Sequence, residues 1–164
     1  MKRILAGFAV VLGLAAGAAH ACPSFANVGV AQYQATGAAL RSPSFFNVVA
    51  GGENNLGRCP QIYNNLGSDQ LDYGQSYFTT QPDFSFFLSG MGNVRLVVSV
   101  VSQCDAALLI NTGAVNWYFD DDDNGNLDPR ISLTRPSDGR MDIWVGTFDG
   151  QYCDAQLRME TFAR

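Results

Sequence analysis

The stretch Val94-Arg95-Leu96-Val97-Val98-Ser99-Val100-Val101 alternates with the period of two that is typical of a β-strand, and it places Leu96, Val98 and Val100 on one face. Two later stretches, 141–146 and 155–160, alternate in the same way. We find no window with the helical period of 3.6. About nine short strands of this kind, separated by turn residues, predict an all-β fold: an antiparallel β-sandwich or jelly roll with long loops.

The beginning of the sequence has the three parts of a secretory signal peptide. Met1-Lys2-Arg3 is basic, an apolar run follows, and Ala19-His20-Ala21 has the A-x-A form of a cleavage site. We therefore expect residues 1–21 to be removed and residues 22–164 to form one exported domain, periplasmic or extracellular. Within it, 22–74 is the loop-rich front part and 75–164 the strand-rich core. No later stretch is long and apolar enough to predict membrane insertion.

Cleavage at that site changes the chemistry available to the protein. Lys2 and His20 are the only lysine and histidine, and both leave with the signal. Eight arginines then face 15 acidic residues, a net charge of −7. Catalytic centres that need His or Lys are excluded, and the acidic balance argues against nucleic acid as a partner. We expect a protein that is not an enzyme.

The four cysteines, Cys22, Cys59, Cys104 and Cys153, predict two disulfides in an exported chain. Three connectivities are open. We favour Cys22–Cys59 and Cys104–Cys153, because Cys104 follows one predicted strand and Cys153 precedes another. If those strands pair antiparallel, the two cysteines meet.

The front part holds few clear signals. A hairpin over 28–40 and a strand over 45–50 are predicted from apolar and turn residues. Residues 51–74, rich in Asn and Gly, predict a long surface loop pinned by Cys59. Later in the chain, Pro136-Ser137-Asp138-Gly139 predicts a hairpin turn.

An acidic run, Asp120-Asp121-Asp122-Asp123-Asn124-Gly125, carries oxygen side chains two residues apart, with Gly where a calcium loop turns. We predict that one Ca²⁺ is the cofactor; its expected ligands are Asp120, Asp122, Asn124, Asn126 through its carbonyl, and Asp128. Ile131 stands where an EF-hand has its bidentate Glu. A solvated acidic turn is the alternative interpretation.

The second half resembles the bacterial pre-peptidase C-terminal domain of secreted proteases, over about residues 75–163. The matching stretches are 104–110, 117–123, 126–131 and 141–148, and the last reads Met-Asp-Ile-Trp-Val-Gly-Thr-Phe. The resemblance implies a β-sandwich module without catalytic activity, sometimes stabilised by calcium. In some relatives such a module helps to bind a polymeric substrate.

We therefore predict a secreted binding module whose partner is a protein or a polysaccharide. Tyr118, Trp144 and Phe148 are the candidate contact residues, because flat aromatic rings stack on sugars and apolar side chains. The alternatives are an envelope protein that works by association and a glycosidase that uses two carboxylates. The acids cluster in one run rather than on facing strands, which favours the first two hypotheses.

Overall fold

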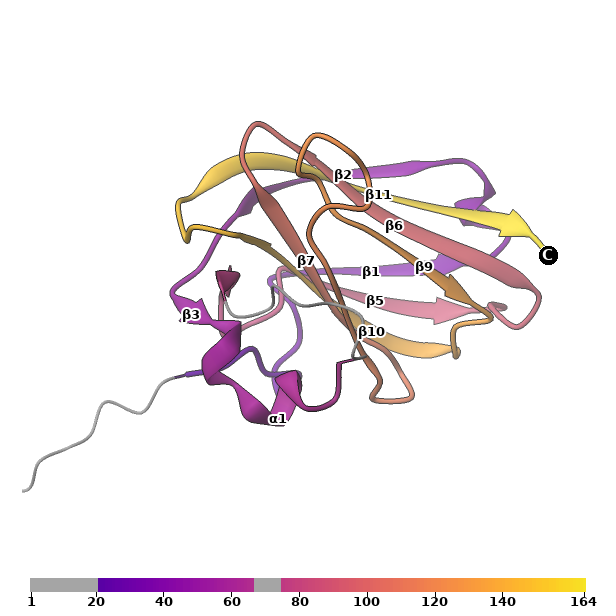
Figure 1. Ribbon diagram of the computed structural model, residues 1–164. Coiled ribbons are helices and arrows are strands. Elements are labelled where there is room, and N and C mark those ends of the chain that lie inside the picture. Colours follow the sequence, from indigo (N-terminus) through magenta and orange to yellow (C-terminus); the bar gives the residue numbers. More distant parts are fainter. Residues whose placement is uncertain (1–20, 67–74) are drawn as a thin grey trace, which may run out of the picture.

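The computed structural model describes residues 21–66 and 75–164. Two β-sheets face each other in a sandwich (Figure 1), which confirms the predicted all-β class. The predicted signal peptide lies outside the described residues except for Ala21, as do residues 67–74 of the predicted loop. In the part that is described, no helix is long and apolar enough to cross a bilayer.

Sheet A contains seven strands. In it, β5 and β7 flank β10. Strand β1 lies outside β5, and β8 lies outside β7. The short strands β4 and β3 extend the sheet at the end of β10. The bounds are β1 Ala31–Thr36, β3 Asn54–Asn55, β4 Tyr77–Phe78, β5 Phe84–Ser89, β7 Ala106–Asn111, β8 Trp117–Asp120 and β10 Gly139–Thr147.

Sheet B contains four antiparallel strands in the order β2-β11-β6-β9. Their bounds are β2 Ser44–Ala50, β6 Val94–Ser102, β9 Arg130–Thr134 and β11 Cys153–Ala163. The predicted antiparallel pairing of 94–101 with the last strand is confirmed, with Ala155 opposite Ser102. Both predicted disulfides, Cys104–Cys153 and Cys22–Cys59, are formed.

The main core lies between the sheets. It takes the inward residues of β5, β6, β7, β10 and β11, which include Phe86, Leu96, Ile110, Ile143 and Leu157. Leu96, Val98 and Val100 all belong to it, as the alternation of that stretch predicts.

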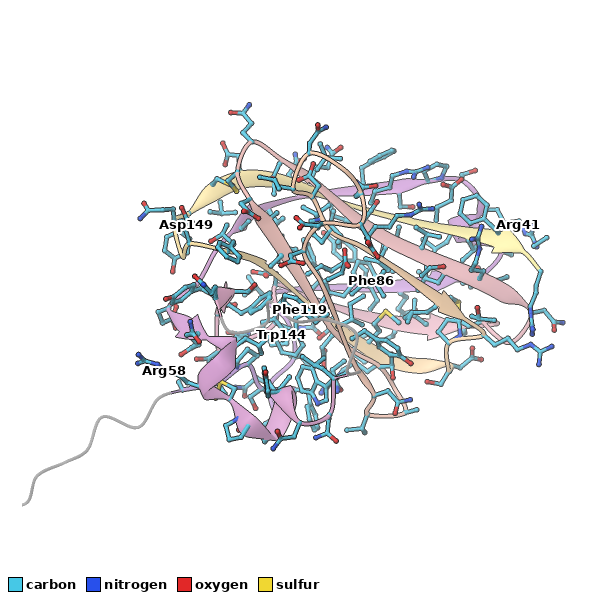
Figure 2. The ribbon with its side chains drawn as sticks, in the orientation of Figure 1. Arg41, Arg58, Phe86, Phe119, Trp144 and Asp149 are labelled. Atoms are coloured by element: carbon cyan, nitrogen blue, oxygen red, sulfur yellow. A yellow bond between two sulfur atoms is a disulfide. The ribbon has the colours of Figure 1, made fainter. Side chains whose placement is uncertain are left out.

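A second core covers the outer face of sheet A. Leu109, Trp117, Phe119 and Trp144 point away from the main core and pack beneath the segment 54–66 (Figure 2). That segment forms a 3-10 turn, η2 Leu56–Arg58, and a short α-helix, α1 Pro60–Tyr63, rather than a plain loop. The Cys22–Cys59 disulfide fastens the start of the described chain to it.

Polar contacts hold the N-terminal segment 22–30 against the same face. The buried Asp142 pairs with Arg140 and accepts a hydrogen bond from Ser85, whose hydroxyl oxygen in turn accepts one from the Gly29 amide (2.7 Å). Arg140 also donates to the Phe25 carbonyl. Burial raises the pKa of Asp142, while Ser85 and Arg140 oppose that rise.

Two predictions about connections are wrong. Residues 28–40 do not form a hairpin, because β1 pairs in parallel with β5 and is followed by a 3-10 turn, η1 Ala39–Arg41. The turn at 136–139 joins β9 of sheet B to β10 of sheet A, so it connects the two sheets rather than two paired strands. Its Asp138 carboxylate accepts hydrogen bonds from the amides of Gly90 and Met91, which lowers its pKa.

The carboxyl group of Asp83, just before β5, should make the stability of the fold depend on pH. Its carboxylate accepts a hydrogen bond from the Val145 amide (2.7 Å), but burial dominates and raises its pKa to about 7. The folded state thus favours the neutral acid. The stability that this protonated group contributes is fully present below the pKa of Asp83 in the unfolded chain, and it is lost as the pH rises through about 7. Asp83→Asn keeps a carbonyl acceptor for Val145 and cannot ionise. We expect its melting temperature to exceed that of the wild type more at pH 8 than at pH 5; an equal difference at both pH values would contradict this.

Candidate binding groove

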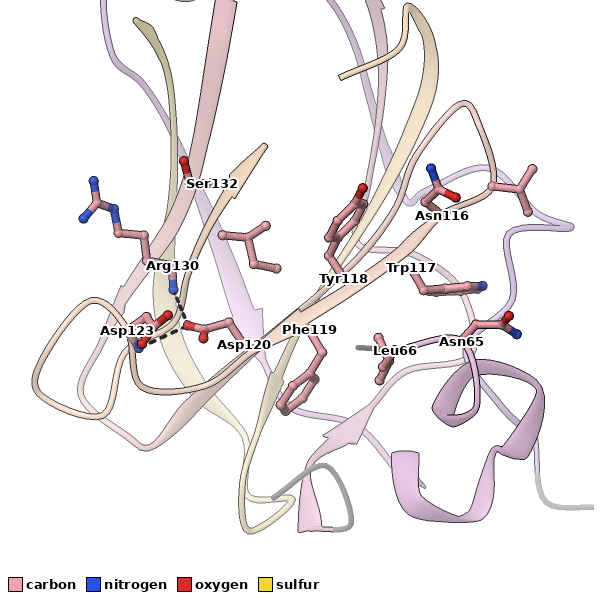
Figure 3. Close-up of a pocket in the computed structure, with 12 residues that line it drawn as sticks. Asn65, Leu66, Asn116, Trp117, Tyr118, Phe119, Asp120, Asp123, Arg130 and Ser132 are labelled. Atoms are coloured by element: carbon pink, nitrogen blue, oxygen red, sulfur yellow. Dashed lines mark hydrogen bonds between the residues drawn. The ribbon is translucent and has the colours of Figure 1, made fainter. Parts of the chain in front are cut away.

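A hollow at the surface lies between an outer strand of sheet A and an outer strand of sheet B. Strand β8 of sheet A leads through the acidic loop into β9 of sheet B, and the space beside them has a volume of about 650 Å³ (Figure 3). Its lining is Asn65, Leu66, Val115, Asn116, Trp117, Tyr118, Phe119, Asp120, Asp123, Arg130, Ile131 and Ser132. We call this space the β8–β9 groove.

Two further hollows continue the groove along β8. One of about 550 Å³ shares Asn65, Val115 and Trp117 with it and reaches the N-terminal segment at Phe25. Another of about 270 Å³ shares Asn116, Tyr118 and Ser132 and reaches Arg135. Together the three hollows form an open surface around β8 rather than a closed pocket for a small molecule.

The aromatic side chains of β8 alternate between two roles. Trp117 packs into the second core against Trp144, with ring centroids 5.4 Å apart, and against Phe25 at 5.9 Å. Tyr118 points the other way and is 37% exposed in the groove. The buried neighbours hold the strand rigid, and Tyr118 is the ring that a ligand can reach.

Asp120 joins the two strands that form the groove. Its carboxylate accepts hydrogen bonds from the amides of Arg130 (2.6 Å) and Asp123 (3.1 Å), so the end of β8 is tied to the start of β9. Burial raises the pKa of Asp120, and these two amides oppose that rise. The groove's shape thus depends on a carboxylate that is already engaged.

Two of the other predicted calcium ligands, Asp128 and Asn124, are hydrogen-bonded to strand β6. Asp128 is buried and accepts from both the amide and the hydroxyl of Ser102, each at 2.9 Å. The Asn124 side chain donates to the Val100 carbonyl (3.0 Å). Asn126 lies beyond Gly125 in a left-handed stretch of backbone, with a φ of 57°.

Asp122 belongs to a different group of acids. Burial raises the pKa of Asp105, and the charges of Asp122 and Asp149 raise it further, so acids from three separate loops gather at this end of the sandwich. Among the residues that the structure describes, no group of three or more Asp, Glu, His or Cys side chains is placed to hold a metal ion. Calcium binding therefore stays a prediction.

Of the three predicted contact aromatics, the structure brings only Tyr118 to the groove. The exposed role predicted for Trp144 is wrong: it is fully buried, because the segment 54–66 covers its face of sheet A, and its indole N–H donates to the Thr80 carbonyl (3.4 Å). Phe148 is half-buried in the loop after β10 and is absent from the groove's lining.

Sequence reasoning missed the polar residues of the groove, Asn65, Asn116, Arg130 and Ser132. Asn111-Thr112-Gly113 before Trp117 is a turn signal that would have made β7 and β8 a hairpin. Nothing in the sequence shows that β8 and β9 lie in different sheets with their edges together.

Comparisons with known proteins give similarities to solved structures only, and one of these structures is described below. No family model matches the chain, and no curated protein matches it. A solved structure of PliG, a periplasmic inhibitor of g-type lysozyme from Aeromonas hydrophila, aligns with a TM-score of 0.43 and 9% identity, over 80% of this chain and 99% of the inhibitor. At this level neither the inhibitor's activity nor its target carries over. The resemblance to the pre-peptidase C-terminal domain stays a prediction.

The anchoring role of Asp128 can be tested by unfolding. Asp128→Ala leaves the Ser102 amide without its acceptor, and we expect a loss of roughly 1–3 kcal/mol in the free energy of unfolding. Asp123→Ala is the matched control, because Asp123 is an exposed acid of the same loop. Urea denaturation of both variants measures the difference. Equal stability of the two would show that the Asp128 contacts add nothing.

The calcium prediction has its own measurement. We predict that about 2 mM Ca²⁺, compared with EDTA, raises the melting temperature of the disulfide-intact protein by several degrees, because a cation would offset the repulsion among the acidic loops. Asp122→Ala should abolish the rise. If calcium causes no shift, the acidic run is a solvated turn.

Proposed function

We propose that this chain is an exported, non-catalytic interaction module that binds an extended segment of a partner protein in the β8–β9 groove. The observation that carries the proposal is the position of the groove: it lies along an outer strand of each sheet, and two further hollows adjoin it near the start of β8.

The residues of the groove suit a protein partner. Tyr, Trp and Arg are the side chains that contribute most at protein interfaces, and Tyr118, Trp117 and Arg130 all line the groove. Outer strands also offer backbone groups with which an extended segment can pair. The amides of Asn65 and Asn116 add adaptable donors and acceptors.

The acids of the groove do not suit glycoside hydrolysis. That reaction needs two carboxyl groups facing each other across a cleft. Asp120 and Asp123 instead lie on the same side, in one loop, and the amide of Asp123 donates to Asp120. Asp120 also holds the Arg130 amide, so its carboxylate is occupied by structural contacts.

Export is supported by the two disulfides, which form and persist in oxidising compartments. It is also supported by the signal-peptide pattern of residues 1–21. The partner would accordingly be a protein of the cell envelope or the surrounding medium.

A display library of random linear peptides, screened against the mature protein, tests the proposal. We expect selected peptides to bind at least about tenfold more weakly to Tyr118→Ala, because a central tyrosine is a typical hot spot. Tyr152→Ala is the control, since Tyr152 is exposed but lies outside the groove. An oligosaccharide array is screened in parallel. Binding of glycans alone, or of peptides that respond equally to the two variants, would contradict the proposal.

A further inference from the structure

Strand β2 is an edge strand with apolar side chains on its solvent face. In the described part of the chain it pairs with β11 alone, so its other edge has no strand beside it. Phe45 is 56% exposed and Val49 55% exposed, and they flank the exposed Asn47. The strand Ser44–Ala50 contains no charged residue, Pro or Gly.

The other edge strands carry charged or polar side chains, of which the charges are a usual protection of an exposed edge. Strand β9 begins with Arg130, β8 ends on Asp120, and β1 exposes Gln32 and Gln34. A long apolar edge without such protection is suited to pairing with another strand.

The inner face of β2 is also incompletely covered. Phe46 and Val48 pack against the main core but remain half-buried. Tyr33 of β1 lies against Phe46, with ring centroids 4.7 Å apart, and is itself still exposed. The side of the sandwich between β1 and β2 therefore leaves apolar surface of the core in contact with water.

We propose that β2 pairs antiparallel with β2 of a second copy of this chain, about a two-fold axis at Asn47. Asn47 is the middle residue of the strand, so every residue from Ser44 to Ala50 finds a partner. Phe45 then lies opposite the partner's Val49 on the outer face, and Phe46 opposite the partner's Val48 on the inner face. The two four-stranded sheets become one continuous sheet.

The charges on the neighbouring strand favour this direction of pairing. On β11, Arg158 stands beside Phe45 and Asp154 beside Val49. Antiparallel pairing therefore puts Arg158 in the same cross-strand row as the partner's Asp154, at both ends of the interface. In-register parallel pairing would instead put like charges in the same rows.

The association should be weak and dependent on concentration. One strand pair buries less than the standard interface of about 1,600 Å², so we expect a weak dimer that forms only at high protein concentration. This surface is separate from the β8–β9 groove, so a dimer would present two grooves.

Cysteine cross-linking tests the register. We would mix mature Phe45→Cys protein with mature Val49→Cys protein and add a short thiol-reactive linker. Antiparallel pairing brings these two positions together, with Cβ atoms roughly 5 Å apart. We expect cross-linked dimers from the mixture and few from either variant alone. Equal cross-linking of the single variants, or none in the mixture, would overturn the proposal.

Sedimentation equilibrium over a wide concentration range tests the dimer itself. Asn47→Asp places two carboxylates opposite each other at the axis and should weaken dimerisation at least about fivefold. Its carboxylate can still accept the hydrogen bond that Gln156 now donates to Asn47 (3.0 Å), so the monomer should keep its melting temperature. Asn93→Asp makes the same change in an exposed turn and should have no effect. A wild type that stays monomeric, or a dimer that tolerates Asn47→Asp, would refute β2 pairing.

Discussion

Strand β10 must be covered on both faces, and much of the structure follows from this requirement. Its residues from Met141 to Thr147 are all buried. One face joins the main core, while the other places Trp144 under the turns of residues 54–66. The Cys22–Cys59 disulfide and the Arg140–Asp142–Ser85 contacts hold that cover in place. The irregular front part of the chain thus stabilises the fold, and its residues Asn65 and Leu66 also line the groove.

Covering sheet A on both faces leaves its outer strands as surfaces for function. Strand β8 is anchored by Trp117 in the second core and by Asp120 at its end, so Tyr118 is presented from a rigid support. Strand β2 lies on the other sheet and presents Phe45 and Val49 instead. A protein without His or Lys after residue 21 can still recognise partners through such edges, because edge recognition uses backbone groups and aromatic rings rather than reactive side chains.

Patterns within one strand predicted much of the fold, and contacts between distant segments account for most of what they missed. The alternation at 94–101 gave both the strand and the face that Leu96 buries, and the cysteine positions gave both disulfides. The alternation at 141–146 put Trp144 on the face opposite Ile143 but could not show that residues 54–66 return to cover it. Turn chemistry at 136–139 gave a turn but not the change of sheet. The groove's polar residues come from four separate parts of the chain, so no local pattern identifies them.

We propose that recognition occurs at the edges of the sandwich. Backbone amide NMR spectra of the mature protein, recorded while a peptide selected for binding is titrated, test it most directly. The account predicts chemical-shift changes concentrated in β8, β9 and the turn at 112–116 that precedes β8. Changes concentrated instead on the acidic loops at 103–105 and 148–151, with β8 unaffected, would contradict it and place recognition at the carboxylates.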